Sequence, residues 1–327
     1  MVRVGVVGTN WITDQLLDAA KPVKNFELTA VYSRTSERAN EFANKYNVEN
    51  IFTNLEEMAS SSIIDAVYIA TPNSYHAQQA ILFLKNRKHV LCEKPLAANA
   101  TEVKKMVETA KLNNVLLMEA MKSTLLPNFK IIQNNLHKVG QIRKFFSSYC
   151  QYSSRYDKYK EGIVLNAFNR IYANGALMDL GIYCLYPLIA LFGEPRDIKA
   201  TSIMLESGVD GEGSVLLKYE DKEAVVMYSK ISNSYLPSEI QGENGCMIID
   251  KLHTPEQVEI RYNDGSIEQL TVEQPYPVMY YEVKEFLDLI ENRDTESSIN
   301  SYKNSYKTMK VMDRIREQIG LNYPNDN

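Results

Sequence analysis

The sequence predicts an α/β protein in two parts, the first built on a parallel sheet and the second on an antiparallel or mixed sheet. Short apolar segments alternate with amphipathic segments over the first 120 residues, which is the order of a parallel sheet with right-handed helical crossovers. After about residue 121 this alternation stops, and residues 198–272 are rich in strand-like segments. At 327 residues the chain is long enough for two cores.

Buried strands and amphipathic helices alternate in the first part. The N-terminal run Val2–Val7 is short, continuous and rich in valine, which is typical of a strand buried on both faces. Further strands are predicted at residues 27–32, 51–52, 65–70, 89–92 and 115–118. Helical spacing predicts helices between them, at residues 12–20, 36–46, 55–60, 76–86 and 101–113.

The second part begins with helices and then becomes strand-rich. Helices are predicted at residues 127–136 and 175–191, and the chain is helical again from Tyr280. Turn signals such as Asp264-Gly265 separate alternating or apolar runs, which predicts a sheet with one free face. The clearest of these runs cover residues 214–219, 224–230 and 257–262. We expect two domains, residues 1–120 and 121–327, joined by a short crossover at residues 119–124.

Composition limits the classes of function. A formal net charge of -5 argues against a chain-wide nucleic-acid surface, which would be basic. We see no apolar run of the roughly 18–20 residues that a membrane helix needs, and the N-terminal apolar stretch is too short for a signal peptide. The four cysteines form no CxxC pair and the four histidines show no metal-ligand spacing. These features predict a cytoplasmic protein with free thiols and no metal site.

A glycine-containing turn follows the first predicted strand. Residues 8–13 stand where a dinucleotide-binding fold places its glycine-rich loop, with free N–H groups of the next helix facing the pyrophosphate. Asn10 replaces the second glycine and tolerates a left-handed backbone, whereas Thr13 adds bulk at the third position. A plain strand-to-helix turn is the alternative. The βαβ context favours cofactor contacts from Gly8, Thr9, Asn10, Trp11 and Ile12.

The end of the second predicted strand favours NADP(H) over NAD(H). An NAD site usually has an acidic residue there, but this chain has none, and Glu27 lies at the opposite edge of the sheet. Ser33 can hydrogen-bond a 2′-phosphate, and the guanidinium of Arg34 can pair with it and stack on adenine. Arg38 completes this predicted set. A solvated surface charge is the alternative for Arg34, and NAD(H) is the alternative cofactor.

Two further stretches carry a family pattern. One is the Thr71-Pro72-Asn73-Ser74-Tyr75-His76 segment followed by Glu93-Lys94-Pro95, and the other is residues 175–184. With the glycine turn, they resemble the Gfo/Idh/MocA oxidoreductases over essentially the whole chain, and residues 179–184 look most like the dimeric dihydrodiol dehydrogenase branch. The resemblance implies an N-terminal Rossmann domain, a doubly wound parallel sheet. It also implies a C-terminal α/β domain with a large open sheet whose outer face often forms a homodimer or homotetramer interface.

The resemblance also implies site residues. Lys94 would lie beside the nicotinamide and substrate, with Asp179 and Tyr183 completing the pocket. The Lys94–Pro95 peptide is often cis in such proteins. Many relatives have a histidine where this chain has Leu126, so the polarity of the pocket is expected to differ.

Hydride transfer requires that a proton moves as well, so an acid/base must stand close to the substrate oxygen. A nearby ammonium such as Lys94 would lower the pKa of a tyrosine from about 10. We therefore expect Tyr183 to act as the acid/base with Lys94 as its partner, although the reverse assignment remains open, as does a packed core tyrosine. Asp179 lies four residues from Tyr183 and would share its helix face, orienting Lys94 or a substrate hydroxyl.

Residues after the fourth predicted strand lie at the sheet edge where ligands bind. Asn73 is expected to contact the cofactor ribose or amide, and His76 to help the pocket or to act structurally. The cofactor-binding set there comprises Thr71, Pro72, Asn73, His76, Glu93, Lys94 and Pro95. Four tyrosines could line the substrate cleft, form a subunit contact or pack as a face: Tyr149, Tyr152, Tyr156 and Tyr159.

The sequence therefore predicts an NADP(H)-dependent dehydrogenase or reductase that acts on a sugar, polyol or related hydroxy or carbonyl compound. One alternative is a regulator that senses NADP(H) without turnover. Another is a structural or assembly subunit that uses the open sheet.

Overall fold

The computed structural model describes residues 1–326, which form two compact units. The first unit comprises Met1–Met121 and Tyr276–Ser305. The second unit comprises Lys122–Pro275 and the chain from Tyr306 onward. These units differ from the two predicted contiguous domains, residues 1–120 and 121–327, because the segment Tyr276–Ser305 returns to the first unit.

The returning segment carries helix α9 (Tyr280–Asn292). This helix is amphipathic, and Val283, Phe286 and Leu287 on its buried face are almost fully excluded from solvent. It packs against helix α1 (Trp11–Ala20) of the first unit. A helix so far along the chain joins the first core because its apolar face finds a partner there, which segment order alone does not indicate.

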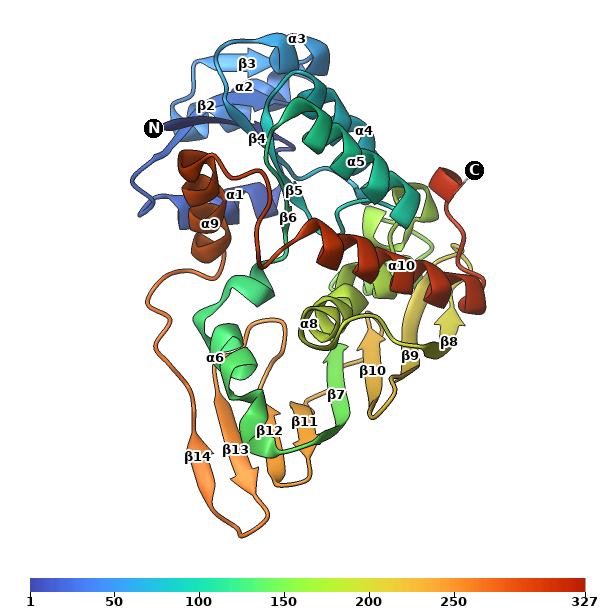
Figure 1. The fold of residues 1–327 in the computed structure, drawn as a ribbon. Helices are drawn as coiled ribbons and strands as arrows, with labels where there is room; N and C mark the ends of the chain where they lie inside the picture. Colours follow the sequence, from blue (N-terminus) through green and yellow to red (C-terminus); the bar gives the residue numbers. More distant parts are fainter. Residues whose placement is uncertain (327) are drawn as a thin grey trace. The chain divides into compact units, whose positions relative to one another are not determined.

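The first unit is built on a six-stranded parallel sheet (Figure 1). Its strands are β1 (Val2–Val7), β2 (Phe26–Tyr32), β3 (Asn50–Phe52), β4 (Ala66–Ile69), β5 (His89–Glu93) and β6 (Leu117–Ala120). The order β3-β2-β1-β4-β5-β6 runs outward from β1 in both directions, so the switch point lies between β1 and β4. This doubly wound topology confirms the prediction and places the ligand edge at the carboxyl ends of those two strands.

Helices of the first unit begin and end by local rules. Besides α1 and α9 they are α2 (Ser36–Tyr46), α3 (Leu55–Ser60), α4 (Asn73–Lys85) and α5 (Ala100–Asn113). Asn47 and Asn114 end α2 and α5 in the left-handed conformation, with φ of 55° and 53°. Four helices begin at side chains that accept first-turn N–H groups: Asn10, Thr35, Asn54 and Asn99.

The last strand of this sheet begins later than predicted. Val115 N–H donates to the Ala110 carbonyl at 3.2 Å, which closes the end of α5. Leu116 N–H donates to Nδ1 of His89 at 3.0 Å. β6 therefore starts at Leu117, two residues after the predicted start at residue 115, because the helix end uses the backbone before it.

The second unit is built on an eight-stranded sheet of order β14-β13-β12-β11-β7-β10-β9-β8 (Figure 1). All neighbours pair antiparallel except β7 and β10, which are parallel. The prediction of an antiparallel or mixed sheet is confirmed, and the sheet is mostly antiparallel. The strands are β7 (Ile142–Cys150), β8 (Asp197–Met204), β9 (Asp210–Lys218), β10 (Glu223–Ser229), β11 (Ser238–Gly242), β12 (Gly245–Ile249), β13 (Val258–Tyr262) and β14 (Ile267–Gln269).

The central strand β7 is absent from the sequence prediction. Its apolar alternation is weak, because Ser147 is buried on the inner side, where it lies 3.1 Å from the hydroxyl of Ser238. The predicted tyrosine face also divides: Tyr149 lies in β7, whereas Tyr156 and Tyr159 lie in helix α7 (Tyr156–Lys160).

One apolar helix covers the inner face of this sheet. Helix α8 (Ile182–Phe192) follows a π-helix (Leu177–Gly181) and packs against β7 and β10. By length and composition the helical stretch Arg170–Phe192 could cross a membrane, so the expectation that no such run exists is wrong. Because 78% of its apolar window is buried inside the protein, the stretch reads as a core helix.

The outer face of the same sheet is open. Along β9, Val215 and Leu217 are buried while Leu216 between them is 55% exposed. Ile203 on the neighbouring strand β8 is also exposed. The remaining helices of the described chain are α6 (Pro127–Asn135) and α10 (Tyr302–Ile319).

Candidate active site

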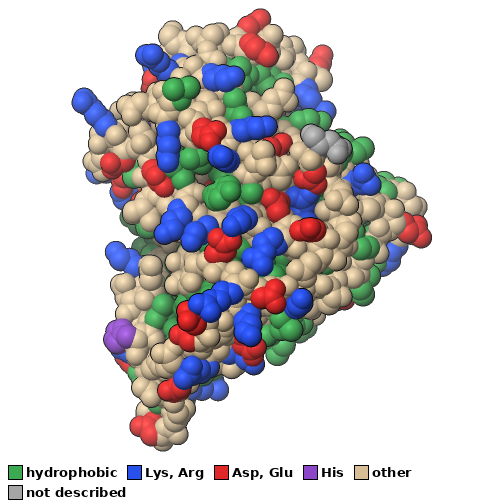
Figure 2. Space-filling model, turned by 45° about the vertical axis from the view of Figure 1, so that its right-hand side comes forward, with side chains coloured by type: hydrophobic (Ala, Val, Ile, Leu, Met, Phe, Trp, Pro, Cys, Tyr) green, Lys and Arg blue, Asp and Glu red, His purple; other side chains and the backbone are tan. Residues whose placement is uncertain are grey.

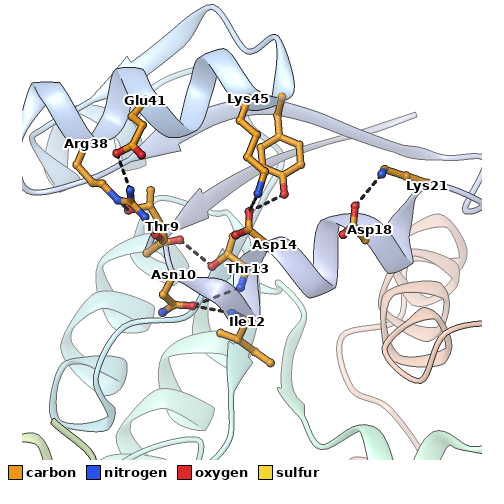
Figure 3. Close-up of polar contacts among 12 residues, drawn as sticks. Thr9, Asn10, Ile12, Thr13, Asp14, Asp18, Lys21, Arg38, Glu41 and Lys45 are labelled. Atoms are coloured by element: carbon orange, nitrogen blue, oxygen red, sulfur yellow. Dashed lines mark hydrogen bonds and ion pairs between the residues drawn. The ribbon is translucent and has the colours of Figure 1, made fainter. Parts of the chain in front are cut away.

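The turn after β1 requires glycine at its first position. Gly8 has φ of +110°, and a Cβ there would stand 2.5 Å from the Ala70 carbonyl oxygen. Asn10, by contrast, has φ of -108°, so the expected left-handed role is wrong. Its side chain accepts from Ile12 N–H at 3.0 Å (Figure 3). The same side chain donates to the Ala70 carbonyl at 2.6 Å. Asn10 therefore closes the turn by capping α1 and joining it to the end of β4.

Thr13 is fully buried between helix and strand, and its hydroxyl donates to the Gly8 carbonyl at 2.8 Å. The extra bulk is therefore accommodated, and the side chain fixes the turn rather than obstructing it. Thr13 N–H also donates to the Asn10 side chain at 3.3 Å. The replaced glycines thus keep the turn closed by side-chain hydrogen bonds.

Backbone N–H groups of this turn, those of Asn10 and Trp11 among them, remain for a ligand. Among residues 1–326, no acceptor bonds to the N–H of Asn10 or Trp11, whereas those of Ile12 and Thr13 are capped. They lie at the positive end of the α1 dipole, which favours an anion. The pyrophosphate of a dinucleotide fits this turn.

A guanidinium is held beside the turn. Arg38 Nη2 donates to the Thr9 carbonyl at 2.7 Å, and Nη1 donates to Glu41 at 2.6 Å (Figure 3). Arg34 is exposed, and within the described residues it makes no hydrogen bond or ion pair. Ser33 lies between β2 and α2, where its N–H donates to the Phe52 carbonyl at 3.2 Å. The chain directly after β2 therefore carries a hydroxyl and a guanidinium, Ser33 and Arg34, and no acidic residue stands at the strand end itself.

The segments after β4 and β5 are joined by His76. This fully buried imidazole lies with Nε2 2.8 Å from the Thr71 carbonyl and Nδ1 2.9 Å from the Pro95 carbonyl. Burial lowers its pKa, and the charge of Lys94 acts in the same direction. Pro72 and Asn73 begin α4, which carries His76. The position of His76 is that of a structural brace between the two loops.

Buried carboxylates flank the Glu93-Lys94-Pro95 segment, whose Lys94–Pro95 peptide is cis, as expected. Glu93 accepts from the hydroxyl of Tyr68 at 2.5 Å and from Lys94 N–H at 3.3 Å. On the next strand, Glu119 accepts from Leu96 N–H at 2.9 Å, and burial raises the pKa of Glu119 to about 7. These contacts fix the backbone on both sides of Lys94.

In the second unit, Asp179 has an ion-pair partner that sequence reasoning missed. Its Oδ2 lies 2.7 Å from Nζ of Lys230, whose side chain is 3% exposed, against 35% for Asp179. Lys230 also donates to the Ala167 carbonyl at 3.2 Å and lies over the ring of Phe168. A lysine that ends a buried strand, just after Ser229 of β10, was the available signal, because a lysine there needs a partner.

The start of the helical segment that carries Asp179 is fixed from the sheet. Asp210 is buried in β9 and accepts from Leu177 N–H at 2.7 Å, and burial raises its pKa to about 6. Gly175 has φ of +142°, and a Cβ there would stand 2.1 Å from Oδ1 of Asp210. Only glycine allows the aspartate to approach this helix start so closely.

Tyr183 lies in an aromatic and basic cluster. The tyrosine is 8% exposed, and its ring meets that of Tyr149 edge to face, with 5.7 Å between the centroids. Tyr149 stacks on His253 at 3.9 Å, and Lys122 Nζ lies 5.8 Å from the centroid of Tyr183. Leu126 is buried and brings no polar group. Lys122 and His253 escaped the sequence prediction because they come from the domain crossover and from a loop after β12.

The doubly wound sheet, the glycine turn and the free N–H groups define a dinucleotide-binding protein. Residues 2–121 match the GFO_IDH_MocA family, described as an oxidoreductase family with an NAD-binding Rossmann fold. Residues 135–248 match the GFO/IDH/MocA C-terminal domain. The chain belongs to this family of oxidoreductases.

Several curated relatives match over their full length. The chain is 54% identical over 326 residues to scyllo-inositol 2-dehydrogenase (NADP(+)) IolU of Bacillus subtilis, covering 100% of this chain and 99% of the relative. It is 45% identical to the uncharacterised oxidoreductase YgjR of Escherichia coli, with the same coverage. Mouse trans-1,2-dihydrobenzene-1,2-diol dehydrogenase is 28% identical, covering 99% of each chain.

Solved structures share the fold at low identity. The 3-ketoreductase KijD10 of Actinomadura kijaniata, in complex with NADP and TDP-benzene, has a TM-score of 0.84 at 22% identity, covering 97% of this chain and 98% of that one. Levoglucosan dehydrogenase in complex with NADH and levoglucosan has a TM-score of 0.82 at 20% identity, covering 98% and 97%.

Proposed function

We propose that this protein is an NADP(H)-dependent dehydrogenase that interconverts a hydroxyl and a ketone on a cyclic polyol or a sugar. The observation that carries the proposal is the 54% identity, over the whole chain, to a relative named as an NADP(+)-dependent scyllo-inositol 2-dehydrogenase. The absence of an acidic residue after β2 supports NADP(H) as the cofactor, and NAD(H) is the weaker alternative.

The first unit supplies the groups that would hold the cofactor. The N–H groups of Asn10 and Trp11, with Gly8, Thr9 and Ile12 around them, suit the pyrophosphate. A 2′-phosphate would be bound by Ser33, Arg34 and Arg38. The ribose and nicotinamide would lie along Thr71, Pro72, Asn73, Glu93, Lys94 and Pro95. When bound, the nicotinamide accepts or delivers the hydride.

Proton transfer is assigned to Tyr183, with Lys94 as its electrostatic partner. A positive charge near a phenol favours the ionised form, so an ammonium makes tyrosine a better base at neutral pH. The ammonium of Lys122 lies over the Tyr183 ring and would act in the same direction. Asp179, held by Lys230, would orient the substrate hydroxyl or Lys94. In the reverse assignment Lys94 is the proton donor, and a Lys94 variant would then be less active than a Tyr183 variant.

The partners follow from the surface and the sheet. Figure 2 shows Lys and Arg side chains interspersed with Asp and Glu side chains over the visible face, which does not suit a nucleic-acid surface.

The exposed Ile203 and Leu216 on the outer sheet face favour a homodimer or homotetramer through this sheet. Light scattering of wild type and Leu216→Asp would test this, since the aspartate should lower the oligomer size. Four free cysteines suit a cytoplasmic location.

The test is a turnover screen. Wild-type protein is assayed with inositols, other polyols, sugars and dihydrodiols, each with NADP(+) and NAD(+). We expect oxidation of at least one cyclic polyol with NADP(+), and Lys94→Ala should lower kcat/KM by at least about 100-fold. Tight NADPH binding without turnover on any compound would contradict the proposal and favour a sensor.

A further inference from the structure

The loop that follows β12 carries a histidine whose backbone is fixed in the second unit. The carbonyl of His253 accepts from the hydroxyl of Ser123, a fully buried residue, at 2.6 Å. Two residues further, the carbonyl of Pro255 accepts from the side chain of Asn128 at 3.1 Å. Leu252 before the histidine is buried. The backbone of this loop is therefore anchored on both sides of His253.

The imidazole ring is positioned as firmly as its backbone. It stacks on Tyr149 with 3.9 Å between centroids and 3° between planes. The ring of Tyr183 meets it edge to face, with 6.3 Å between centroids. Two aromatic side chains from β7 and α8 therefore fix the ring beside the tyrosine that we assign to proton transfer.

The ring nitrogens are left for a partner outside the described chain. Within residues 1–326, no group hydrogen-bonds Nδ1 or Nε2 of His253, although the side chain is half-buried. Burial and the ammonium groups of Lys122 and Lys251 lower its pKa to about 4, against the opposing charge of Asp250. Near pH 7 the ring is therefore uncharged and offers one N–H donor and one acceptor.

Lys122 adds a second unmatched polar group to this cluster. Its ammonium lies over the ring of Tyr183 and makes no hydrogen bond or ion pair within the described chain. Polar groups that lose water without gaining a partner are costly. A fixed donor–acceptor ring beside a fixed donor suits a ligand with neighbouring hydroxyls, since each hydroxyl both donates and accepts.

We propose that His253 is a substrate-binding residue whose imidazole hydrogen-bonds a polyol hydroxyl next to the one that is oxidised. This proposal rests on the proposed function of a polyol or sugar dehydrogenase. It assigns His253 no step in proton transfer. His253 sets which polyols are accepted, because a compound without the matching hydroxyl leaves the ring nitrogens unpaired.

The test compares two substitutions at this position. His253→Phe keeps the stack on Tyr149 but removes both ring nitrogens, whereas His253→Gln keeps a donor and an acceptor. His137→Phe is the matched control, because His137 is an exposed histidine of the same unit. Each variant is assayed with the best cyclic polyol from the turnover screen and with its deoxy derivatives, and NADPH affinity is titrated in parallel.

We expect His253→Phe to lower kcat/KM at least tenfold through a higher KM, with NADPH affinity within twofold of wild type. His253→Gln should recover most of this loss, and His137→Phe should change nothing. His253→Phe should also lose the preference for the complete polyol over one deoxy derivative. Unchanged KM in His253→Phe, or equal losses in both substitutions, would overturn the proposal. An inactive wild type would instead overturn the proposed function and this inference with it.

Discussion

The two halves of the predicted site are built in different ways. In the first unit, the cofactor turn is fixed partly by near neighbours, such as Thr13 on Gly8, and partly by Arg38, which reaches back 29 residues to Thr9. In the second unit, Asp179 is paired with Lys230, 51 residues later, and Tyr183 meets rings from two other segments. The turn therefore rests in part on contacts between near neighbours, whereas the groups around Asp179 and Tyr183 are held by contacts between segments far apart in the chain.

The largest effect is expected where a distant pair is broken. Asp179→Asn leaves the buried ammonium of Lys230 without its carboxylate, which should cost about 3 to 5 kcal/mol of unfolding free energy. Lys230→Met leaves only the part-exposed Asp179, so its cost should be smaller, about 1 kcal/mol. Chemical denaturation of both variants and of the double variant checks this order. If both single variants lost the same unfolding free energy, the difference in burial between Lys230 and Asp179 would not determine the cost of breaking the ion pair.

The pKa of Glu119 rises on folding from 4.5 to about 7, so the free energy of unfolding should change with pH by up to about 3 kcal/mol. The folded state binds the Glu119 proton more tightly than the unfolded state does. The stabilisation that this proton gives is therefore lost as pH rises from 4.5 to about 7. Glu119→Gln, which can still accept from Leu96, should remove this loss. Unfolding free energies at pH values across the range measure it, with the exposed Glu108→Gln as the control. A parallel pH dependence of wild type and Glu119→Gln would contradict the buried acid.

At the cofactor turn, Gly8→Ala should destabilise the protein by about 2 kcal/mol and weaken NADPH binding. The positive φ disfavours a side chain, and the new Cβ would crowd the Ala70 carbonyl. Thermal unfolding and NADPH titration measure the two effects. Gly162→Ala is the control, since its φ is also positive but a Cβ there meets nothing within 4 Å. Equal effects of the two variants would mean that the close approach to β4 does not matter.

A smaller effect separates the two arginines. Arg34→Ala should weaken NADPH binding about tenfold, or about 1.4 kcal/mol, and leave NADH binding unchanged. Arg38→Ala also frees Thr9, so it should weaken both cofactors. Fluorescence titration of each variant with NADPH and NADH measures the difference. If Arg34→Ala weakened both equally, the assignment of Arg34 to the 2′-phosphate would be wrong.

Much of the first unit could be predicted from the sequence, because its signals are local. The apolar run Val2–Val7 and the helix Ser36–Tyr46 have the predicted bounds, and the cis Lys94–Pro95 peptide followed from the resemblance. The role of Asn10 was misjudged, since a cap and a left-handed residue use the same amino acid.

The second unit resisted prediction because its order comes from pairing between distant strands. The central strand β7 has a mixed pattern, and only its neighbours β10 and β11 show that it belongs in the sheet. Lys230 and His253 carry no local motif, and their roles emerge from contacts with Asp179 and Tyr149. A lysine at the end of a buried strand indicates that a partner is needed, but not that the partner is Asp179, and nothing in the sequence marks His253.

The most direct measurement is a comparison of Tyr183→Phe with wild type, in which cofactor binding and turnover of a cyclic polyol are followed on the same preparations. If the first unit binds the cofactor and Tyr183 of the second unit moves the proton, Tyr183→Phe should bind NADPH with a dissociation constant within twofold of wild type. Its kcat should be lowered about 100-fold or more. Turnover by Tyr183→Phe at the wild-type rate would contradict the assignment of the proton to this tyrosine.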